Sequence, residues 1–288
     1  MQDISLELVS KATEGSREAL EALAAGVEGQ VYNLSLRMLG SVHDAQDASQ
    51  EILIRIITQL SSFRGQSAFS TWTYRIATNF LINYKKSMFA NMPLSFEYYG
   101  KDIDAGFVPN TPELLQNADE GLLADELKQS CTNVMLQCLD PESRCIYVLG
   151  LMFRIDSGTG AEIFGITPEA YRQKLSRAKK KMADFLGEYC GLSKTGKCDC
   201  KKRVGYAITT HRLNPENLEY SRLERSESSE FINAMEDMDE RSAVFASLPE
   251  YRAPARKRAF IDELLSSESM KRIKAEAQHG THTGYQGA

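Results

Sequence analysis

One short stretch of the sequence concentrates side chains that are suited to binding DNA. Residues 168–181 contain six basic residues and a single acid, Glu169. In the major groove an arginine pairs with guanine and a glutamine with adenine, while lysines and hydroxyl groups bind backbone phosphates. The stretch therefore predicts a DNA-contacting surface, with an ordinary solvated basic helix as the alternative. The candidate contact residues are Arg172, Gln173, Lys174, Ser176, Arg177 and Lys180.

The residues around this stretch have the spacing of a helix-turn-helix. Ala161 is small enough for a close helix crossing, Gly165 is free to take a left-handed turn, and Thr167 is placed to cap the next helix. Apolar residues then recur three or four apart, which leaves the basic side chains facing outward. Gly158 and Gly160 each disfavour the first helix by about 1 kcal/mol relative to alanine, so we expect that helix to be short or frayed. The apolar positions of the second helix are Tyr171, Leu175, Ala178, Met182 and Phe185.

Three cysteines, Cys190, Cys198 and Cys200, follow within a lysine-rich segment and form a second candidate site. Neighbouring positive charge favours the thiolate form, which metal binding and thiol redox chemistry both require. With His211 as a fourth donor, the set has the donor types of a tetrahedral zinc site, although its spacing is not a common zinc pattern. A zinc site, a redox dithiol and a merely basic tail all stay open. We expect the other three cysteines, Cys131, Cys138 and Cys145, to be buried core thiols.

The elements that must position these sites are helices. Ser41 and Asp44 have capping-box spacing at the start of a segment, 41–63, in which apolar residues recur three or four apart. One face of that helix is therefore committed to a core, while the other presents Asp47 and Glu51. A second amphipathic helix follows Gly65, and helical segments at 4–23 and 31–39 complete a compact helical domain.

Prolines, glycines and acids interrupt this pattern in the middle of the chain, where we expect an acidic linker that is too polar and broken to pack. Four segments, at Thr111, Asp140, Thr167 and Asn214, place a capping residue before Pro-Glu, which is a strong helix start. The predicted fold class is all-α, with two small helical domains. The expected ranges are 1–89 for the first domain, 90–121 for the linker, 122–187 for the helix-turn-helix domain, 188–212 for the basic cysteine-containing segment and 213–288 for an acidic, partly disordered extension.

The overall composition excludes several classes of protein. With 42% hydrophobic and 25% charged residues, the chain is neither wholly disordered nor a collagen-like or disulfide scaffold. No apolar run reaches the ~18 residues of a membrane span, so we expect no membrane insertion and a cytoplasmic location. The net charge of −5 hides a strong segregation, because the basic stretch lies between acidic segments at 97–126 and 213–250.

Two further motifs, taken with the helix-turn-helix, resemble a known family. The first runs DAQDASQEILIRI from Asp44, and the second runs FRGQSAFSTWTYRIATN from Phe63. In this order, and followed by the helix-turn-helix, they resemble the extracytoplasmic-function class of bacterial sigma-70 factors. The resemblance covers roughly residues 19–86 and 136–186, about half of the chain.

The resemblance implies a two-domain subunit that gives RNA polymerase its promoter specificity, directs melting and initiation, is not itself an enzyme and requires no cofactor. It implies that the acidic helix binds the clamp helices of core polymerase. The polymerase flap and promoter DNA are the other implied partners, and an anti-sigma factor is a further candidate. The residues that match the polymerase-binding positions are Asp47, Gln50, Glu51 and Ile54.

The resemblance also implies that the loop and helix after Gly65 capture unstacked bases of the minus-ten element, while the basic helix binds the minus-35 element. Base capture needs aromatic rings to receive a base and cations to hold the displaced strand. The helical register of Trp72 predicts that it is a core residue before it is a DNA contact. The candidates are Phe69, Trp72, Tyr74, Arg75, Asn79 and Lys85.

Two other functions remain as alternatives. One is a helix-turn-helix regulator that binds DNA alone. The acidic helix and the loop after Gly65, which the resemblance matches to DNA melting, both argue against it. The other is a thiol-based redox sensor that uses the cysteine cluster, although the sequence has no Cys-x-x-C motif or nucleotide loop. The acidic linker suggests a strand that occupies a positively charged channel of the polymerase, with a solvated tether as the alternative.

Overall fold

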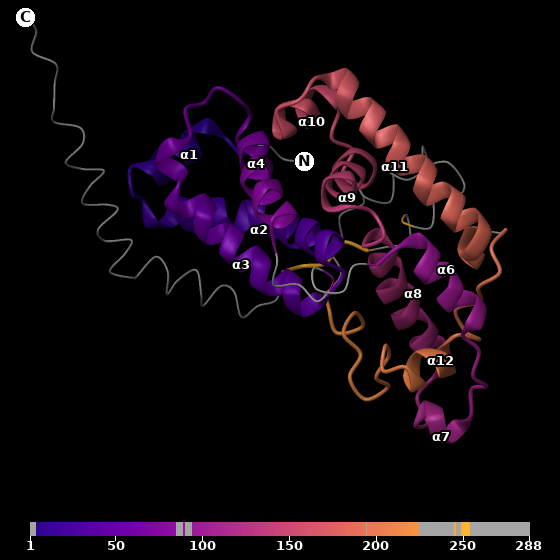
Figure 1. Ribbon diagram of the computed structural model, residues 1–288. Helices are drawn as coiled ribbons and strands as arrows, with labels where there is room; N and C mark the ends of the chain where they lie inside the picture. Colours follow the sequence, from indigo (N-terminus) through magenta and orange to yellow (C-terminus); the bar gives the residue numbers. More distant parts are fainter. Residues whose placement is uncertain are drawn as a thin grey trace, which may run out of the picture.

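The computed structural model describes residues 4–84, 89, 94–193, 195–224, 245 and 249–253, and helices joined by turns make up this part of the chain (Figure 1). No β-strand occurs in these residues, so the predicted all-α fold is confirmed. None of the described helices is long and apolar enough to cross a membrane. Lys85, one of the predicted DNA-binding residues, lies outside the described residues.

The first group of helices forms a bundle at the amino-terminal end. It contains α1 (Leu6–Thr13), α2 (Arg17–Leu39), α3 (Val42–Thr58), the 3₁₀ helix η1 (Leu60–Ser62) and α4 (Phe69–Ile82), which lie together in Figure 1. The long α2 ends at Gly40, whose φ of 70° is left-handed. The Ser41 hydroxyl then accepts a hydrogen bond from the backbone N–H of Asp44 at 3.2 Å, as the capping-box spacing predicts.

The second group of helices forms the other half of the molecule. It contains α6 (Phe96–Ala105), α7 (Pro112–Leu115), α8 (Glu120–Leu136), α9 (Pro141–Tyr147), the π-helical turn η2 (Val148–Met152), α10 (Ser157–Phe164), α11 (Pro168–Tyr189), the 3₁₀ helix η3 (Gly191–Ser193) and α12 (Val204–Thr209). The first helix of the helix-turn-helix, α10, has only eight residues, which agrees with the expectation from its glycines.

Three of the four predicted Pro-Glu helix starts are confirmed. Thr111, Asp140 and Thr167 each accept a hydrogen bond from the backbone N–H three residues further on. The fourth prediction is wrong, because Asn214 instead forms a turn in which its side-chain oxygen accepts from Glu216 N at 3.0 Å. The backbone N–H groups that follow bind a carboxylate of α8 and are not available for a helix.

The segment expected to be an unpacked acidic linker contains a packed helix, α6. Its Tyr99 ring is buried and stacks on Phe185 of α11, with ring centroids 5.9 Å apart, while Phe96 contacts the same ring at 5.1 Å. Its Asp102 forms ion pairs with Arg203 and Arg212 of the later basic segment. The expectation is wrong for this helix because its aromatic residues supply an apolar face and distant arginines neutralise its acid.

The two groups of helices share one core. Arg144 of α9 donates to the carbonyl oxygen of Met38 in α2 at 2.6 Å, and Arg37 of α2 donates to Asn133 Oδ1 of α8 at 2.8 Å. Apolar side chains from both groups, including Leu53 of α3 and Leu186 of α11, belong to a single buried cluster. The two helical parts are therefore packed on each other in addition to being joined by chain.

Candidate nucleic-acid and protein interfaces

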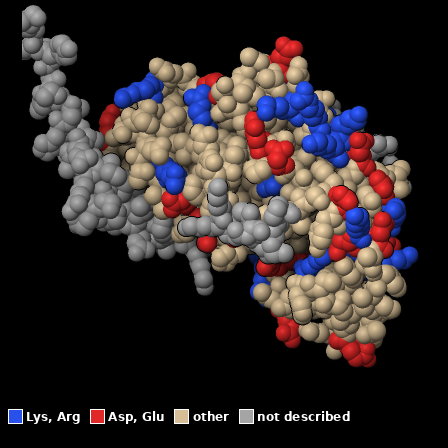
Figure 2. Space-filling model, in the orientation of Figure 1, with Lys and Arg blue, Asp and Glu red and all other residues tan. Residues whose placement is uncertain are grey.

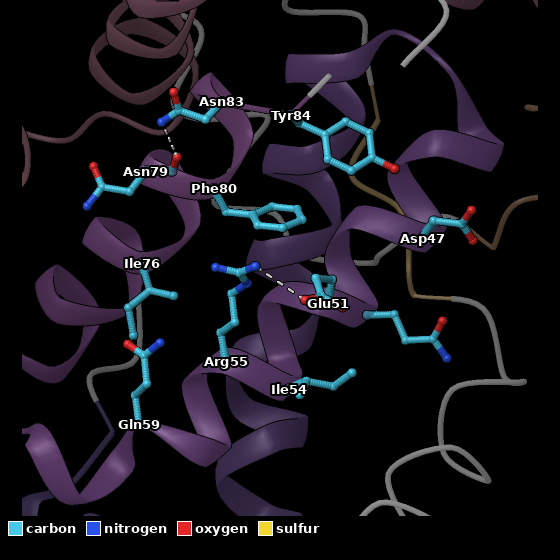
Figure 3. Close-up of a pocket in the computed structure, with 11 residues that line it drawn as sticks. Asp47, Glu51, Ile54, Arg55, Gln59, Ile76, Asn79, Phe80, Asn83 and Tyr84 are labelled. Carbon is cyan, nitrogen blue, oxygen red and sulfur yellow. Dashed lines mark hydrogen bonds and ion pairs between the residues drawn. The ribbon is translucent and has the colours of Figure 1, made fainter. Parts of the chain in front are cut away.

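A groove of about 900 Å³ separates the outer faces of α3 and α4 (Figure 3). All four predicted protein-docking residues line it, because positions 47, 50, 51 and 54 fall on one face of α3. The opposite wall comes from α4 and the residues just after it. The complete lining is Asp47, Gln50, Glu51, Ile54, Arg55, Gln59, Ile76, Asn79, Phe80, Asn83 and Tyr84.

The groove combines an apolar wall with an acidic rim. Phe80 supplies the wall, and the guanidinium of Arg55 lies over its ring at 4.7 Å while also approaching Glu51 at 3.4 Å. Asp47 is exposed at the rim. Burial raises the pKa of the Tyr84 hydroxyl, and nearby carboxylates that include those of Asp47 and Glu51 raise it further, which indicates a negative potential in the groove. Such a groove suits a helix with apolar and basic side chains.

Two residues of this groove, Phe80 and Tyr84, were not among the predicted site residues. Phe80 has the helical spacing of a core residue, since it follows Ile76 by one turn of α4. Both are only partly buried, and their rings lie 5.4 Å apart between centroids. The signal that points to them is the continuation of the four-residue spacing to position 84, beyond the end of α4.

The basic face of α11 points outward as its periodicity predicts. Arg172, Gln173, Ser176, Arg177 and Lys180 are exposed, whereas Tyr171, Ala178, Met182 and Phe185 are buried. Figure 2 shows lysine and arginine side chains gathered over this helix. Lys174 is half-buried and forms an ion pair of 3.0 Å with Glu142, so it is less available for a ligand than its neighbours.

The helix-turn-helix geometry depends on two glycines with different roles. Gly165 has a φ of 65° at the end of α10, a left-handed conformation that the turn requires. Gly160 lies against the ring of Tyr171, and a Cβ atom there would be 2.4 Å from Tyr171 Cζ. The glycine that weakens α10 therefore also lets α10 and α11 cross closely.

Three of the predicted minus-ten residues, Phe69, Trp72 and Tyr74, pack into the core in this arrangement. Phe69 and Tyr74 are only 1% and 4% exposed. Phe69 packs against Phe63 and Trp72, with ring centroids 5.3 and 5.5 Å away, so the expectation that it receives an unstacked base is wrong here. The cause is the close spacing of three aromatic residues, which together form a core cluster. Trp72 is half-buried, in agreement with its core register.

Two residues of the same helix, Arg75 and Asn79, retain exposed surface. Asn79 is exposed and lines the groove between α3 and α4. Arg75 is partly exposed, but it donates to the carbonyl oxygen of Glu162 in α10 at 2.8 Å and lies 3.5 Å from the carboxylate of that residue. The structure thus places a predicted DNA-binding cation in contact with the helix-turn-helix.

The predicted zinc donors are not gathered into a metal-binding group. Cys190 is buried, Cys198 and Cys200 are half-buried, and His211 is exposed with a left-handed φ of 58°. Among the described residues, no three or more histidine, cysteine, aspartate or glutamate side chains are arranged to hold a metal ion.

Burial has a larger effect than the neighbouring lysines on the protonation state of these thiols. It raises the pKa values of Cys198 and Cys200 to about 12, so the expected stabilisation of thiolates by positive charge is wrong for this fold. One nearby cation, Lys197, is instead paired with Asp104 at 2.9 Å. After burial, the largest influence on Cys200 is Cys131, a distant cysteine expected to be only a core thiol.

The comparisons with known proteins include a family match to the part of the chain that forms the groove between α3 and α4. Residues 23–87 match the family described as Sigma-70 region 2. The extracytoplasmic-function sigma factor SigW of Bacillus subtilis is 39% identical over 75 residues, which are 26% of this chain and 40% of SigW. The RNA polymerase sigma-H factor of Pseudomonas aeruginosa is 26% identical over 136 residues, or 47% of this chain and 70% of that protein. The sigma-E factor of Escherichia coli is 33% identical over 127 residues, or 42% of this chain and 63% of that protein. The chain therefore spans less than two thirds of the Bacillus and Escherichia relatives.

Proposed function

The chain belongs to the extracytoplasmic-function class of the sigma-70 family, and from this membership we propose that it binds core RNA polymerase and directs promoter recognition, DNA melting and transcription initiation. The observation that supports this best is the groove between α3 and α4, because it lies within the matched region and is lined by all four docking candidates. The family is not a class of enzymes. The proposed activity requires no cofactor and takes place with polymerase in the bacterial cytoplasm.

Each interface has a separate task in this proposal. The acidic rim of α3 binds the clamp helices of the polymerase through Asp47, Gln50, Glu51 and Ile54. The outward face of α11 binds the minus-35 element, and its domain contacts the polymerase flap. An anti-sigma protein is a further proposed partner, and zinc at the cysteine segment is a separate proposal that elemental analysis tests.

The same features weigh against the two alternatives. A regulator that binds DNA alone does not require a protein-binding groove such as that between α3 and α4, in which an acidic rim faces an apolar wall. A redox sensor needs a reactive thiolate, whereas Cys198 and Cys200 have pKa values raised to about 12.

The decisive test is co-purification of the tagged full-length chain with core polymerase from its source, followed by run-off transcription on promoter fragments. We expect the double change Asp47→Ala with Glu51→Ala to weaken polymerase binding about tenfold or more, since two interface residues worth ~1 kcal/mol each multiply their effects. The matched control is Glu7→Ala with Glu14→Ala, which removes two exposed acids, one in α1 and one at its C-cap, outside the matched region. Failure of the wild-type chain to bind polymerase or to initiate transcription would overturn the proposal.

A further inference from the structure

Three described parts of the chain after residue 212 together contact both groups of helices, and we propose that they act as a clasp that keeps promoter DNA away from α4 until it is released. The clasp is defined here as residues 213–224, 245 and 249–253. The inference rests on the proposed function, because it concerns access to the part of α4 that the resemblance to sigma factors matches to the minus-ten element.

The first attachment of the clasp is a carboxylate buried in α8. Glu126 is 3% exposed, and one of its oxygens accepts hydrogen bonds from the backbone N–H groups of Glu219 and Tyr220 at 2.6 and 2.8 Å. The other oxygen accepts from the backbone N–H and the hydroxyl of Ser221, both at 2.8 Å. Four donors on one charged acceptor make this a strong and geometrically specific anchor.

The second attachment joins the clasp to both groups of helices at once. Asn33 of α2 pairs with the backbone of Tyr251, accepting from its N–H at 3.0 Å and donating to its carbonyl oxygen at 2.9 Å. The hydroxyl of the same tyrosine donates to Gln129 of α8. Arg37 of α2, which already binds α8, also donates to the carbonyl oxygen of Pro249 at 2.7 Å. Residues 249–251 therefore bridge α2 and α8.

Aromatic packing reinforces these polar contacts. Tyr220 and Tyr251 are buried together and pack on Tyr32 of α2 and Val42 of α3. Phe245 is fully buried against Tyr147 of α9, with ring centroids 5.5 Å apart. Burial of large aromatic side chains is the usual source of strong association between separate elements. The clasp thus contributes both specific hydrogen bonds and apolar burial to the arrangement in which the two groups of helices are packed together, which we call closed.

In the closed arrangement, two α4 residues that the resemblance to sigma factors matches to the minus-ten element, Tyr74 and Arg75, contact the second group of helices. Tyr74 packs on Phe153, with ring centroids 6.3 Å apart, and Arg75 is bound to Glu162 of α10. A DNA strand that reaches these two side chains must first displace α10 and Phe153, which directly follows η2, from α4. Binding of the minus-ten element and the packed arrangement of the two helical groups, which the clasp bridges, are therefore mutually exclusive at this surface.

The increase in DNA affinity on release of the clasp depends on the fraction of molecules that are already open, that is, in which the two groups of helices have separated. When only the open form binds a ligand, the apparent dissociation constant exceeds the intrinsic one by the inverse of the open fraction. If about one molecule in ten is open, a freed clasp increases DNA affinity about tenfold. A more completely closed population gives a larger increase.

The test uses full-length variants that release the clasp from opposite sides. Glu126→Gln keeps the shape of the α8 anchor but turns an amide N–H₂ toward donors, and Asn33→Ala removes the α2 anchor while favouring the helix. The matched control is Arg222→Ala, an exposed change in the clasp whose side chain donates hydrogen bonds to Asn217 and Glu216 nearby. Circular dichroism checks that each variant keeps its helices. Small-angle scattering measures the radius of gyration, and a labelled promoter fragment selected by run-off transcription measures DNA binding.

We expect both release variants to have a larger radius of gyration and about tenfold higher DNA affinity than the wild type, with the control unchanged. Unchanged DNA affinity in variants that have opened would overturn the clasp, as would an unchanged radius in both variants. These results are separate from failure of the proposed function, in which neither the wild type nor any variant binds core polymerase.

Discussion

The carboxylate of Asp102 organises the contact between α6 and the basic segment, so the isosteric change Asp102→Asn should destabilise the fold. Arg212 donates to its two oxygens at 2.5 and 2.7 Å, Arg203 donates at 3.0 Å, and the Tyr206 hydroxyl donates at 2.8 Å. Asparagine keeps the shape of the side chain, but it removes the charge and replaces one acceptor with a donor that faces cations.

The size of the effect follows from the burial of these partners. The side chains of Asp102 and Arg203 are 7% and 13% exposed, whereas that of Arg212 is 39% exposed and regains part of its hydration when the pair breaks. Removal of one member of a buried ion pair costs ~3–5 kcal/mol. We expect the lower end, about 3 kcal/mol in the free energy of unfolding, which corresponds to ~6–12 °C in Tm for a chain of this size.

The effect should also depend on pH. Burial alone would raise the pKa of Asp102, but hydrogen bonds from Arg212 and Tyr206 and the charges of both arginines outweigh burial and lower it. Because the folded pKa lies below the unfolded value of ~4, the carboxylate stabilises the fold above that pH, and the stabilisation is lost as the pH falls through the folded pKa. The difference between wild type and variant should therefore be complete at pH 7 and shrink below about pH 4.

Urea unfolding followed by circular dichroism, at neutral and acidic pH, measures this difference. Asp104→Asn is the matched control, since Asp104 lies on the same helix and pairs with Lys197 at 2.9 Å, but both side chains are about half exposed. An exposed pair is worth less than ~1 kcal/mol. Equal losses for the two variants at pH 7 would refute the reasoning about the buried pair.

Three further outcomes are expected. Arg177→Ala should weaken promoter binding and lose ~1–3 kcal/mol of discrimination at one base pair, whereas Lys180→Ala should weaken binding to all DNA sequences alike. Competition with altered promoter fragments measures both effects. Unchanged base preference in the arginine variant would contradict the assignment of this face of α11 to DNA. The Cys198 thiol, with a pKa raised to about 12, should react slowly with a thiol reagent at neutral pH in the folded chain. About one zinc per chain by elemental analysis, lost in Cys198→Ser, would show instead that a metal holds a thiolate there. Gly160→Ala should lower the free energy of unfolding by ~1–3 kcal/mol despite the better helix propensity of alanine, because its Cβ would lie 2.4 Å from the Tyr171 ring; a thermal melt as stable as the wild type would count against this packing.

The features that could be predicted from the sequence are those that depend on residues close together in the chain. The hydroxyl of Ser41 and the Thr167 cap each bind a backbone N–H three residues away, so spacing alone identifies them. The outward face of α11 follows from helical periodicity in the same way. The docking residues of α3 share one groove because they share one face of one helix.

The features that could not be predicted depend on partners far away in the chain. The residues around Asp102 in the sequence do not indicate that Arg212 forms an ion pair with it. In the same way, the residues around Cys200 do not indicate that Cys131 lies close enough to affect the pKa of Cys200. Tyr74 likewise packs on Phe153, a residue far away in the chain that follows η2 of the other helical group. A local pattern shows which side chains are polar or apolar, but only the fold determines which of them face one another.

The distant pairings also change the meaning of the charge segregation. The acidic segment around 97–126 suggested a strand able to imitate nucleic acid, yet Asp102 is bound by arginines, Asp119 caps α8 and Glu126 holds the clasp. Asp102 and Glu126 are therefore committed to contacts inside the molecule and are not free to imitate nucleic acid, whereas Asp119 is exposed at the start of α8. Arg177 and Lys180 on α11 remain exposed. Despite a net charge of −5, the helix proposed to bind DNA thus presents exposed positive charge to a partner.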